Sequence, residues 1–319
     1  MSEKIIGQMQ AIGAIAPFVQ MYQAGLAPES RPAGVFLLLG PTGTGKTRTV
    51  EALAEVIHGS ARNILRIDCG EFQMEHEVAK LVGAPPGYLG HRETQPILTQ
   101  AKLSSVASEH SNLSLVLFDE IEKAAPSMTR LMLGILDKAT LRLGDNNVVN
   151  FEKTFIFMTS NLGAQGIRNE LHPAFGFQSG VARDLQAAGG KIENIARAAA
   201  YRQFAPEFLN RIDVAITFQP LCHHSLTTIL DQQIQELQKH IDRRLGVRAF
   251  RIHVPKSSRQ FLLKEGTSSE FGAREIKRTL HRHLTQPLAA LVAENRVAPG
   301  SCLSVELSPD KSGLRLRAA

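Results

Sequence analysis

A glycine-rich stretch near the start of the chain has the composition of a loop that binds phosphate. Glycine adopts left-handed conformations without strain, so the backbone N–H groups can turn inward, and a following helix adds the positive end of its dipole. Lys46 would reach the terminal phosphates of a nucleotide, and Thr47 would place its hydroxyl on Mg²⁺. The stretch consists of Gly40, Pro41, Thr42, Gly43, Thr44, Gly45, Lys46 and Thr47.

A glycine-rich turn with a surface lysine is the alternative interpretation of this stretch. By residue frequencies, roughly one chain in a hundred of this length carries the pattern by chance. The context favours phosphate binding, because the apolar run 35–39 precedes the loop and a helix-like segment, 49–57, follows it.

Polar side chains follow two other apolar runs, at the points where strands would end. Asp119 and Glu120 follow the run 113–118, and Asn161 follows the run 154–158. In a parallel sheet, these residues would lie beside the phosphate loop. Asp119 would hold Mg²⁺ through water, Glu120 would polarise the attacking water, and Asn161 would orient that water or contact the terminal phosphate. Taken singly, acids or an asparagine after a strand are usually solvated turn residues.

Strand-like and helix-like segments alternate in the first two thirds of the chain. This alternation is typical of βαβ units, so the predicted fold class is α/β, with a parallel sheet between helices. Strands are expected at 35–39, 63–68, 113–118, 154–158 and 214–218. Helices are expected before Gly25 and at 49–57, 94–109 and 126–136.

The composition also indicates two domains. Residues 163–203 are rich in Gly, Ala and Gln, which suggests a surface insertion with helical pieces, and Pro220 ends the last strand of the sheet. We therefore expect a large nucleotide-binding domain at 1–220 and a smaller, mostly helical α+β domain at 221–319. The smaller domain is predicted to have helices at 224–244, 257–264 and 273–295 and strands at 250–254, 302–307 and 314–317.

Bulk properties favour a protein of the cytoplasm. The chain has 319 residues, of which 43% are hydrophobic, so it can bury packed cores. Its apolar runs are far shorter than the ~20 residues that cross a bilayer, and the N-terminus has no signal-peptide pattern, so no membrane partner is expected. Three widely spaced cysteines without a Cys-x-x-Cys pair fit a reducing compartment, with neither disulfides nor structural zinc.

The net charge of +6 makes nucleic acid a partner to consider. The basic residues are spread along the chain, however, and they form no basic tail. A lightly basic solvated surface is the favoured interpretation, and a nucleic-acid partner is not expected.

Six short motifs occupy residues 40–47, 83–90, 117–124, 159–163, 206–213 and 271–278. In order and spacing they resemble the motifs of the Clp AAA+ unfoldases, and most closely those of the second ATPase ring of ClpB-type disaggregases. The resemblance extends from about residue 5 to residue 307. ClpB-type chains also carry an N-terminal domain, a first ATPase ring and a coiled-coil middle domain, which this sequence does not contain.

This resemblance implies an AAA+ P-loop fold, ATP hydrolysis with Mg²⁺ and further site residues. Ile5 and Ile6 would pack against adenine. Arg211 is similar to the arginine finger that reaches the nucleotide of a neighbouring subunit, and Arg274 is similar to the sensor arginine of the second domain. A guanidinium neutralises charge on the transferred phosphoryl group, and a finger supplied by a neighbour requires a ring, so a homo-hexamer is expected.

The resemblance also implies a substrate, an unfolded or aggregated polypeptide pulled through the central pore. Tyr88 is similar to the pore-loop aromatic residue that grips the chain, within the segment Gly87, Tyr88, Leu89 and Gly90. Phe175, Gly176 and Phe177 lie where peptidase-partnered relatives carry a docking loop, but Phe175 is not the aliphatic residue of that loop. An ATPase that acts on nucleic acid and a nucleotide-switched scaffold for one dedicated partner are the alternatives to an unfoldase.

Overall fold

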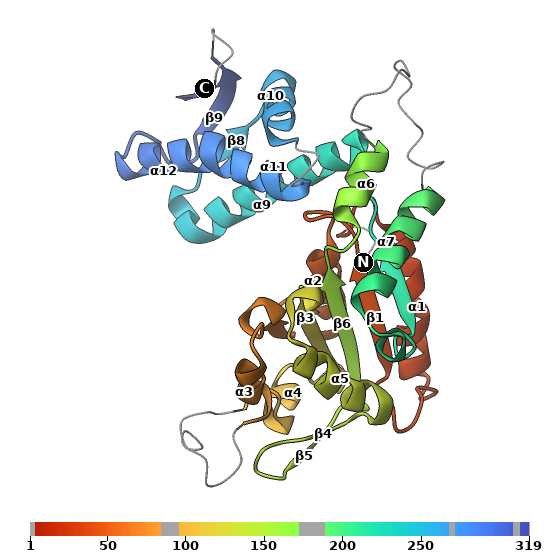
Figure 1. Cartoon of the computed structure of the whole chain (residues 1–319). Coiled ribbons are helices and arrows are strands. Elements are labelled where there is room, and N and C mark those ends of the chain that lie inside the picture. The colour runs from red at the N-terminus through yellow and green to blue at the C-terminus, as the bar shows by residue number, and fades with distance from the viewer. Residues whose placement is uncertain (1–3, 84–95, 172–188, 268–271, 309–312, 319) are drawn as a thin grey trace, which may run out of the picture. The chain divides into compact units, whose positions relative to one another are not determined.

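The computed structural model describes residues 4–83, 96–171, 189–267, 272–308 and 313–318 (Figure 1). The chain forms two compact units, which we call the large unit (Met1–Pro41 with Gly45–Gln219) and the small unit (Thr42–Thr44 with Pro220–Ala319). Two predicted contact segments lie outside the described residues. They are the pore-loop residues Gly87, Tyr88, Leu89 and Gly90 and the Phe175, Gly176 and Phe177 segment.

A parallel five-stranded sheet forms the centre of the large unit, with the strand order β2-β3-β6-β1-β7. All residues of β1 and β6 are buried, as expected for parallel strands covered on both faces. The strands are β1 (Gly34–Leu39), β2 (Leu65–Asp68), β3 (Ser114–Asp119), β6 (Thr154–Ser160) and β7 (Val214–Thr217). The sheet confirms the predicted α/β class and brings the carboxyl ends of β1, β3 and β6 to one edge.

The two faces of this sheet carry different hydrophobic clusters. Along β1, Val35 and Leu37 belong to one cluster, and Phe36 and Leu38 belong to the other. Buried residues of α5 (Pro126–Lys138) and α7 (Gly189–Gln203) complete the first cluster, and those of α1 (Met9–Gln23) and α2 (Lys46–His58) complete the second. Helices therefore hold the sheet from both sides (Figure 1). Shorter elements of the large unit are α3 (Ala79–Val82), α8 (Pro206–Leu209) and the hairpin of β4 (Thr140–Arg142) and β5 (Val148–Asn150).

The helix predicted at 94–109 is wrong in its extent. The structure has only α4 (Gln100–Ser105) in its described part. Thr99 caps this helix, because its side chain accepts a hydrogen bond from the N–H of Lys102 at 3.2 Å. Past the helix, Ser108 and Ser111 form an isolated β-bridge. The serines of this stretch favour local turns over a longer helix.

The expected surface insertion at 163–203 contains α6 (Ala164–Leu171) and α7, and its helical pieces are confirmed. Besides exposed residues, these helices contribute side chains to the core of the large unit. Ile167 of α6 and Ile192 and Ala196 of α7 are fully buried in the first cluster of the sheet. The low apolar content of the segment concealed this role, because a few well-spaced residues are enough to anchor a helix.

The small unit combines four helices and a three-stranded sheet among the described residues, so the mostly helical α+β prediction holds. The long helix expected at 273–295 is interrupted by a π-helical turn at His281–Thr285. The elements are α9 (His223–Leu245), α10 (Lys256–Gly266), α11 (Ala273–Leu280), α12 (Gln286–Ala293), β8 (Arg251–His253), β9 (Cys302–Leu307) and β10 (Leu314–Ala318).

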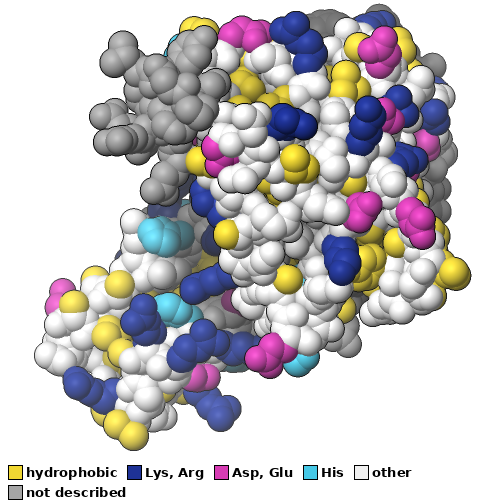
Figure 2. All heavy atoms as spheres, turned by 90° about the horizontal axis from the view of Figure 1, so that it is seen from below, with side chains coloured by type: hydrophobic (Ala, Val, Ile, Leu, Met, Phe, Trp, Pro, Cys, Tyr) yellow, Lys and Arg dark blue, Asp and Glu magenta, His cyan; other side chains and the backbone are white. Residues whose placement is uncertain are grey.

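Charged side chains of both signs occur on the face of the molecule that Figure 2 shows. On the face in Figure 2, Asp and Glu side chains lie among Lys and Arg side chains in the larger, right-hand part, and Lys and Arg side chains are more numerous at the lower left. This mixture agrees with a lightly basic solvated surface. Separately, no helix within the described ranges has the length and apolar character needed to cross a membrane.

Candidate functional site

The predicted phosphate loop joins the end of β1 to the start of α2. Gly40, Gly43 and Gly45 have φ angles of 135°, 75° and 103°, a region that residues with a side chain rarely adopt. A Cβ atom at Gly40 would also lie 2.5 Å from the carbonyl oxygen of Phe218. Gly45 precedes α2 and carries no side chain that could cap this helix, whose N-terminus favours an anion.

Lys46 is held tightly by the loop although it is charged. The residue is only 8% exposed. Its Nζ donates hydrogen bonds to the carbonyl oxygens of Gly40 at 2.6 Å and Pro41 at 2.9 Å, and to Oδ1 of Asn161 at 2.9 Å. These acceptors match the three N–H donors of an ammonium group, so the charge is fixed at the loop.

Asn161 connects the phosphate loop to the acidic end of β3. Its Oδ1 accepts from Lys46, and its Nδ2 donates to Oε1 of Glu120 at 3.3 Å. Its own backbone N–H donates to Oε1 of Glu122 at 3.0 Å. The structure thus brings together three of the predicted residues, Lys46, Glu120 and Asn161, from separate strand ends.

Glu120 stands in an unusual backbone conformation. Its φ angle is 58° in the left-handed region, which costs a residue with a side chain about 1 kcal/mol. Besides Asn161, its carboxylate meets Nζ of Lys123 at 2.5 Å. This hydrogen bond is the main cause that raises the pKa of Lys123. The carboxylate of Glu120 is therefore held between an amide and an ammonium group.

Thr159, to which the sequence interpretation gave no role, organises both acids. This residue of β6 is 1% exposed. Its hydroxyl donates to Oδ1 of Asp119 and accepts from the backbone N–H of Glu120, the latter at 3.0 Å. The other carboxylate oxygen of Asp119 pairs with Arg66 of β2. A polar residue within a buried strand, just before Asn161, was the signal available in the sequence.

The strand ends also concentrate negative charge. Cys69, which directly follows β2, is buried, and burial together with Asp119, Asp68, Glu122 and Glu120 raises the pKa of its thiol. Such a cluster favours a cation. The donors of the predicted metal site, the hydroxyl of Thr47 and the carboxylate of Asp119, are hard oxygens of the kind that Mg²⁺ prefers. The residues present therefore fit Mg²⁺.

The remaining predicted residues lie elsewhere in the two units. Ile5 is 3% exposed and Ile6 is half-buried. Arg211, between α8 and β7, pairs with Oδ1 of Asp137 on α5 at 2.7 Å and stays 45% exposed. Arg274 is an exposed residue in the first turn of α11 in the small unit.

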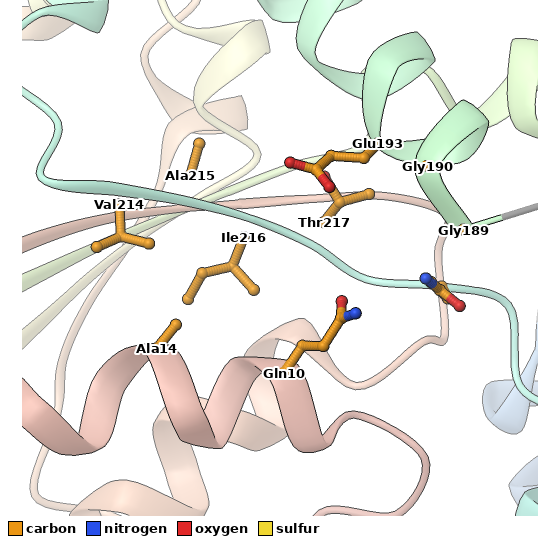
Figure 3. A pocket seen from close by; sticks show the side chains of 10 residues that line it. Gln10, Ala14, Gly189, Gly190, Glu193, Val214, Ala215, Ile216 and Thr217 are labelled. Atoms are coloured by element: carbon orange, nitrogen blue, oxygen red, sulfur yellow. The ribbon is translucent and has the colours of Figure 1, made fainter. Parts of the chain in front are cut away.

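A separate hollow of about 450 Å³ lies between β7, α1 and α7 (Figure 3). Gln10 and Ala14 of α1 line one side, and Glu193 of α7 lines the other. The hydroxyl oxygen of Thr217, another lining residue, is buried and has no hydrogen-bond partner among the described residues. None of the residues that line this hollow belongs to the phosphate loop or to the acidic strand end.

Comparison with known proteins follows the same two-part division. Residues 31–215 match the family described as AAA domain (Cdc48 subfamily), and residues 221–305 match the C-terminal, D2-small domain, of ClpB protein. The chaperone protein ClpB of Meiothermus ruber is 35% identical over 307 residues, which cover 96% of this chain. The probable chaperone protein ClpB 1 of Chlorobaculum tepidum is 34% identical over 307 residues.

The chain spans 33% of the length of the Meiothermus protein and 66% of the Chlorobaculum protein. Among solved structures, the Saccharomyces cerevisiae Hsp104:casein complex in its extended conformation has a TM-score of 0.82 at 27% identity. That match covers 99% of this chain and 51% of the Hsp104 chain. Because the first family match alone covers more than half of the sequence, the chain belongs to the AAA+ ATPases, in which it is similar to the second ATPase ring of ClpB-type chaperones.

Proposed function

We propose that this chain hydrolyses ATP with Mg²⁺ and, as part of a hexameric ring, uses the reaction to unfold or remodel polypeptides. The observation that carries the proposal is the bonded series Lys46, Asn161 and Glu120. This series joins a phosphate loop to an acid at the carboxyl ends of parallel strands, where open α/β sheets bind their ligands.

The nucleotide would be bound mainly by the loop. Its inward N–H groups and the N-terminus of α2 would surround the phosphates. Lys46 would give up its hydrogen bonds to the loop carbonyls and donate to phosphate oxygens in their place. Ile5 and Ile6 would offer apolar surface to adenine. When bound, Mg²⁺ neutralises phosphate charge. Thr47 would hold the ion through its hydroxyl, and Asp119 would hold it through water.

Hydrolysis would depend on Glu120 and Asn161. Glu120 would accept a proton from the attacking water as its oxygen bonds to the γ-phosphorus and the bond to the β-phosphate oxygen breaks, releasing ADP. Asn161 would hold that water in line. Thr159 fixes the main chain at Glu120, so the carboxylate starts from a defined position. Arg274 of the same subunit and Arg211 of a neighbour would stabilise charge on the transferred phosphoryl group.

The polypeptide substrate is supported by the resemblance around Tyr88 and by the solved relatives. One Hsp104 structure was obtained with ATPγS and FITC casein, and another is a casein complex. For this chain, a bare aromatic ring at Tyr88 would give broad contact with extended chains of any sequence.

The test is the ATPase rate against protein concentration, with and without unfolded casein. We expect a steep dependence on concentration, because a finger supplied in trans requires assembly, and we expect casein to stimulate the rate. Tyr88→Ala should abolish the stimulation. Tyr201→Ala is the matched control, because Tyr201 is a tyrosine of α7 that is 60% exposed, and it should respond as wild type does. A flat rate, indifferent to casein and to Tyr88, would contradict the proposal and favour the scaffold or nucleic-acid alternatives.

Thr159→Val provides a second test, directed at the ATP site. The change keeps the shape of the side chain but removes the hydroxyl that bonds Asp119 and Glu120. We expect kcat to fall about tenfold, since one lost hydrogen bond to a charged group is worth roughly 1.5–3 kcal/mol. Thr154→Val, at the opposite end of β6 and equally buried, is the control for stability. Unchanged turnover in Thr159→Val would show that the acids keep their positions without the hydroxyl.

A further inference from the structure

Glu122 is a half-buried acid of the large unit that the proposed reaction leaves without a role. It lies in the short 3₁₀ turn Ile121–Lys123, directly after Glu120 and Ile121. One carboxylate oxygen, Oε1, accepts the backbone N–H of Asn161. The other, Oε2, is buried and accepts no hydrogen bond within the part of the chain that the structure describes. An unsatisfied buried carboxylate oxygen is unfavourable, and such exceptions concentrate at functional sites.

The one hydrogen bond that the carboxylate of Glu122 accepts from the described residues is well placed. Asn161 is the first residue after β6, so the sheet no longer holds its backbone. Its side chain bridges Lys46 and Glu120, so the position of its backbone affects whether the amide can reach both. The bond from Asn161 N–H to Glu122 fixes that position. Displacement of a reacting group by about 1 Å can reduce a rate a hundredfold, so this restraint matters to chemistry.

Glu122 is itself anchored from another side. Its backbone carbonyl oxygen accepts a hydrogen bond from Nε2 of Gln203, at the end of α7, at 3.4 Å. Ile121 beside it is 1% exposed and belongs to the first hydrophobic cluster. The carboxylate therefore projects from a fixed turn, and its hydrogen bond restrains the backbone of Asn161.

We propose that Glu122 is a positioning residue for ATP hydrolysis that acts through the backbone of Asn161 and does not touch the nucleotide. The proposal rests on the role of Asn161 proposed above. It requires an acceptor atom at position 122 and no negative charge there.

The experiment compares Glu122→Met, which removes the acceptor at similar length, with Glu122→Gln, which keeps it. ATP turnover, the KM for ATP, binding of a fluorescent ATP analogue and thermal unfolding are measured for the assembled protein. Glu122→Met should lower kcat about tenfold with the KM unchanged, because positioning is lost while phosphate binding is kept. Glu122→Gln should keep kcat within about threefold of wild type, since its amide oxygen still accepts the N–H of Asn161. Glu109→Ala, at an exposed glutamate, is the control.

Asn161→Ala and the double variant Asn161→Ala/Glu122→Met separate the two proposals. If Asn161→Ala retains full turnover, the role proposed for Asn161 fails. If Asn161→Ala loses turnover, Glu122→Met should have no further effect in that background. Independent effects that multiply in the double variant would overturn the role of Glu122. A Glu122→Gln protein that folds but loses as much turnover as Glu122→Met would also overturn it, because charge would then matter more than the acceptor.

Discussion

Glu120→Gln is expected to bind ATP and to assemble as wild type does, yet to lose turnover by at least about a hundredfold. General-base assistance by a positioned side chain contributes about 10²–10⁴ to a rate, and a neutral amide cannot accept the proton of the attacking water. The substitution keeps size and shape, so the left-handed backbone at position 120 and its bond to Thr159 should persist. The loss should therefore appear in kcat and leave nucleotide binding intact.

Single-turnover hydrolysis and titration with a fluorescent ATP analogue would measure the two effects separately. Glu152→Gln is a suitable control, because Glu152 is an exposed glutamate that precedes β6 in the same unit. Turnover above a tenth of the wild-type rate, with binding intact, would contradict the assignment of Glu120 as the base. Another group near the strand ends would then have to activate the water.

The contact between Glu120 and Lys123 bears on this result. Lys123 holds Oε2 of Glu120 at 2.5 Å, and Asn161 holds Oε1. A carboxylate with both oxygens engaged has fewer lone pairs for a water molecule, so the water must share an oxygen with one of these donors. In Glu120→Gln the ion pair with Lys123 is lost, but Lys123 is about half exposed, so the effect on stability should be below about 1 kcal/mol.

The meeting of the strand ends at one edge of the sheet could be predicted from the sequence, because each strand is recognisable from a pattern of neighbouring residues. The runs before Gly40, Asp119 and Asn161 read as buried strands, and parallel strands bring their carboxyl ends to one edge. The proximity of Lys46, Glu120 and Asn161 follows from that rule. The parallel sheet and the small helical unit could also be predicted, because each of their helices and strands follows from a local pattern of residues.

Side-chain contacts between distant residues were not predictable in this way. The hydroxyl of Thr159 donates a hydrogen bond to Asp119 on the neighbouring strand, and the backbone N–H of Asn161 donates one to Glu122. Both bonds depend on the register in which β3 and β6 pair, which the sequence does not specify. In the sequence, Thr159 is an ordinary strand residue and Glu122 an ordinary solvated acid. The short extent of α4 was missed for a related reason, since local side-chain bonds at Thr99 and the serines decided it.

Arg211→Ala is expected to reduce turnover about a thousandfold in the assembled ring, the order of effect that an arginine finger supplies. In this structure Arg211 pairs with Asp137 and remains 45% exposed. A half-exposed ion pair contributes at most about 1 kcal/mol, so thermal unfolding should hardly change. Arg130→Ala is the control, because Arg130 is an exposed arginine that forms a surface ion pair with Glu75 in the same unit. Undiminished turnover in Arg211→Ala would contradict the finger assignment.

Mixing two inactive proteins tests whether Arg211 acts in trans. An Arg211→Ala subunit keeps its own Glu120 and lacks only the guanidinium that it offers to a neighbour. A Glu120→Gln subunit cannot hydrolyse ATP, but it still offers Arg211. In mixed rings, a site with Glu120 can therefore lie next to a subunit with Arg211, and activity should return well above that of either variant alone. Mixtures that stay as inactive as their components, although mixed assembly is shown by labelled subunits, would mean that Arg211 serves its own subunit. Such a result would also remove the main reason for a ring, because a finger in cis needs no neighbour.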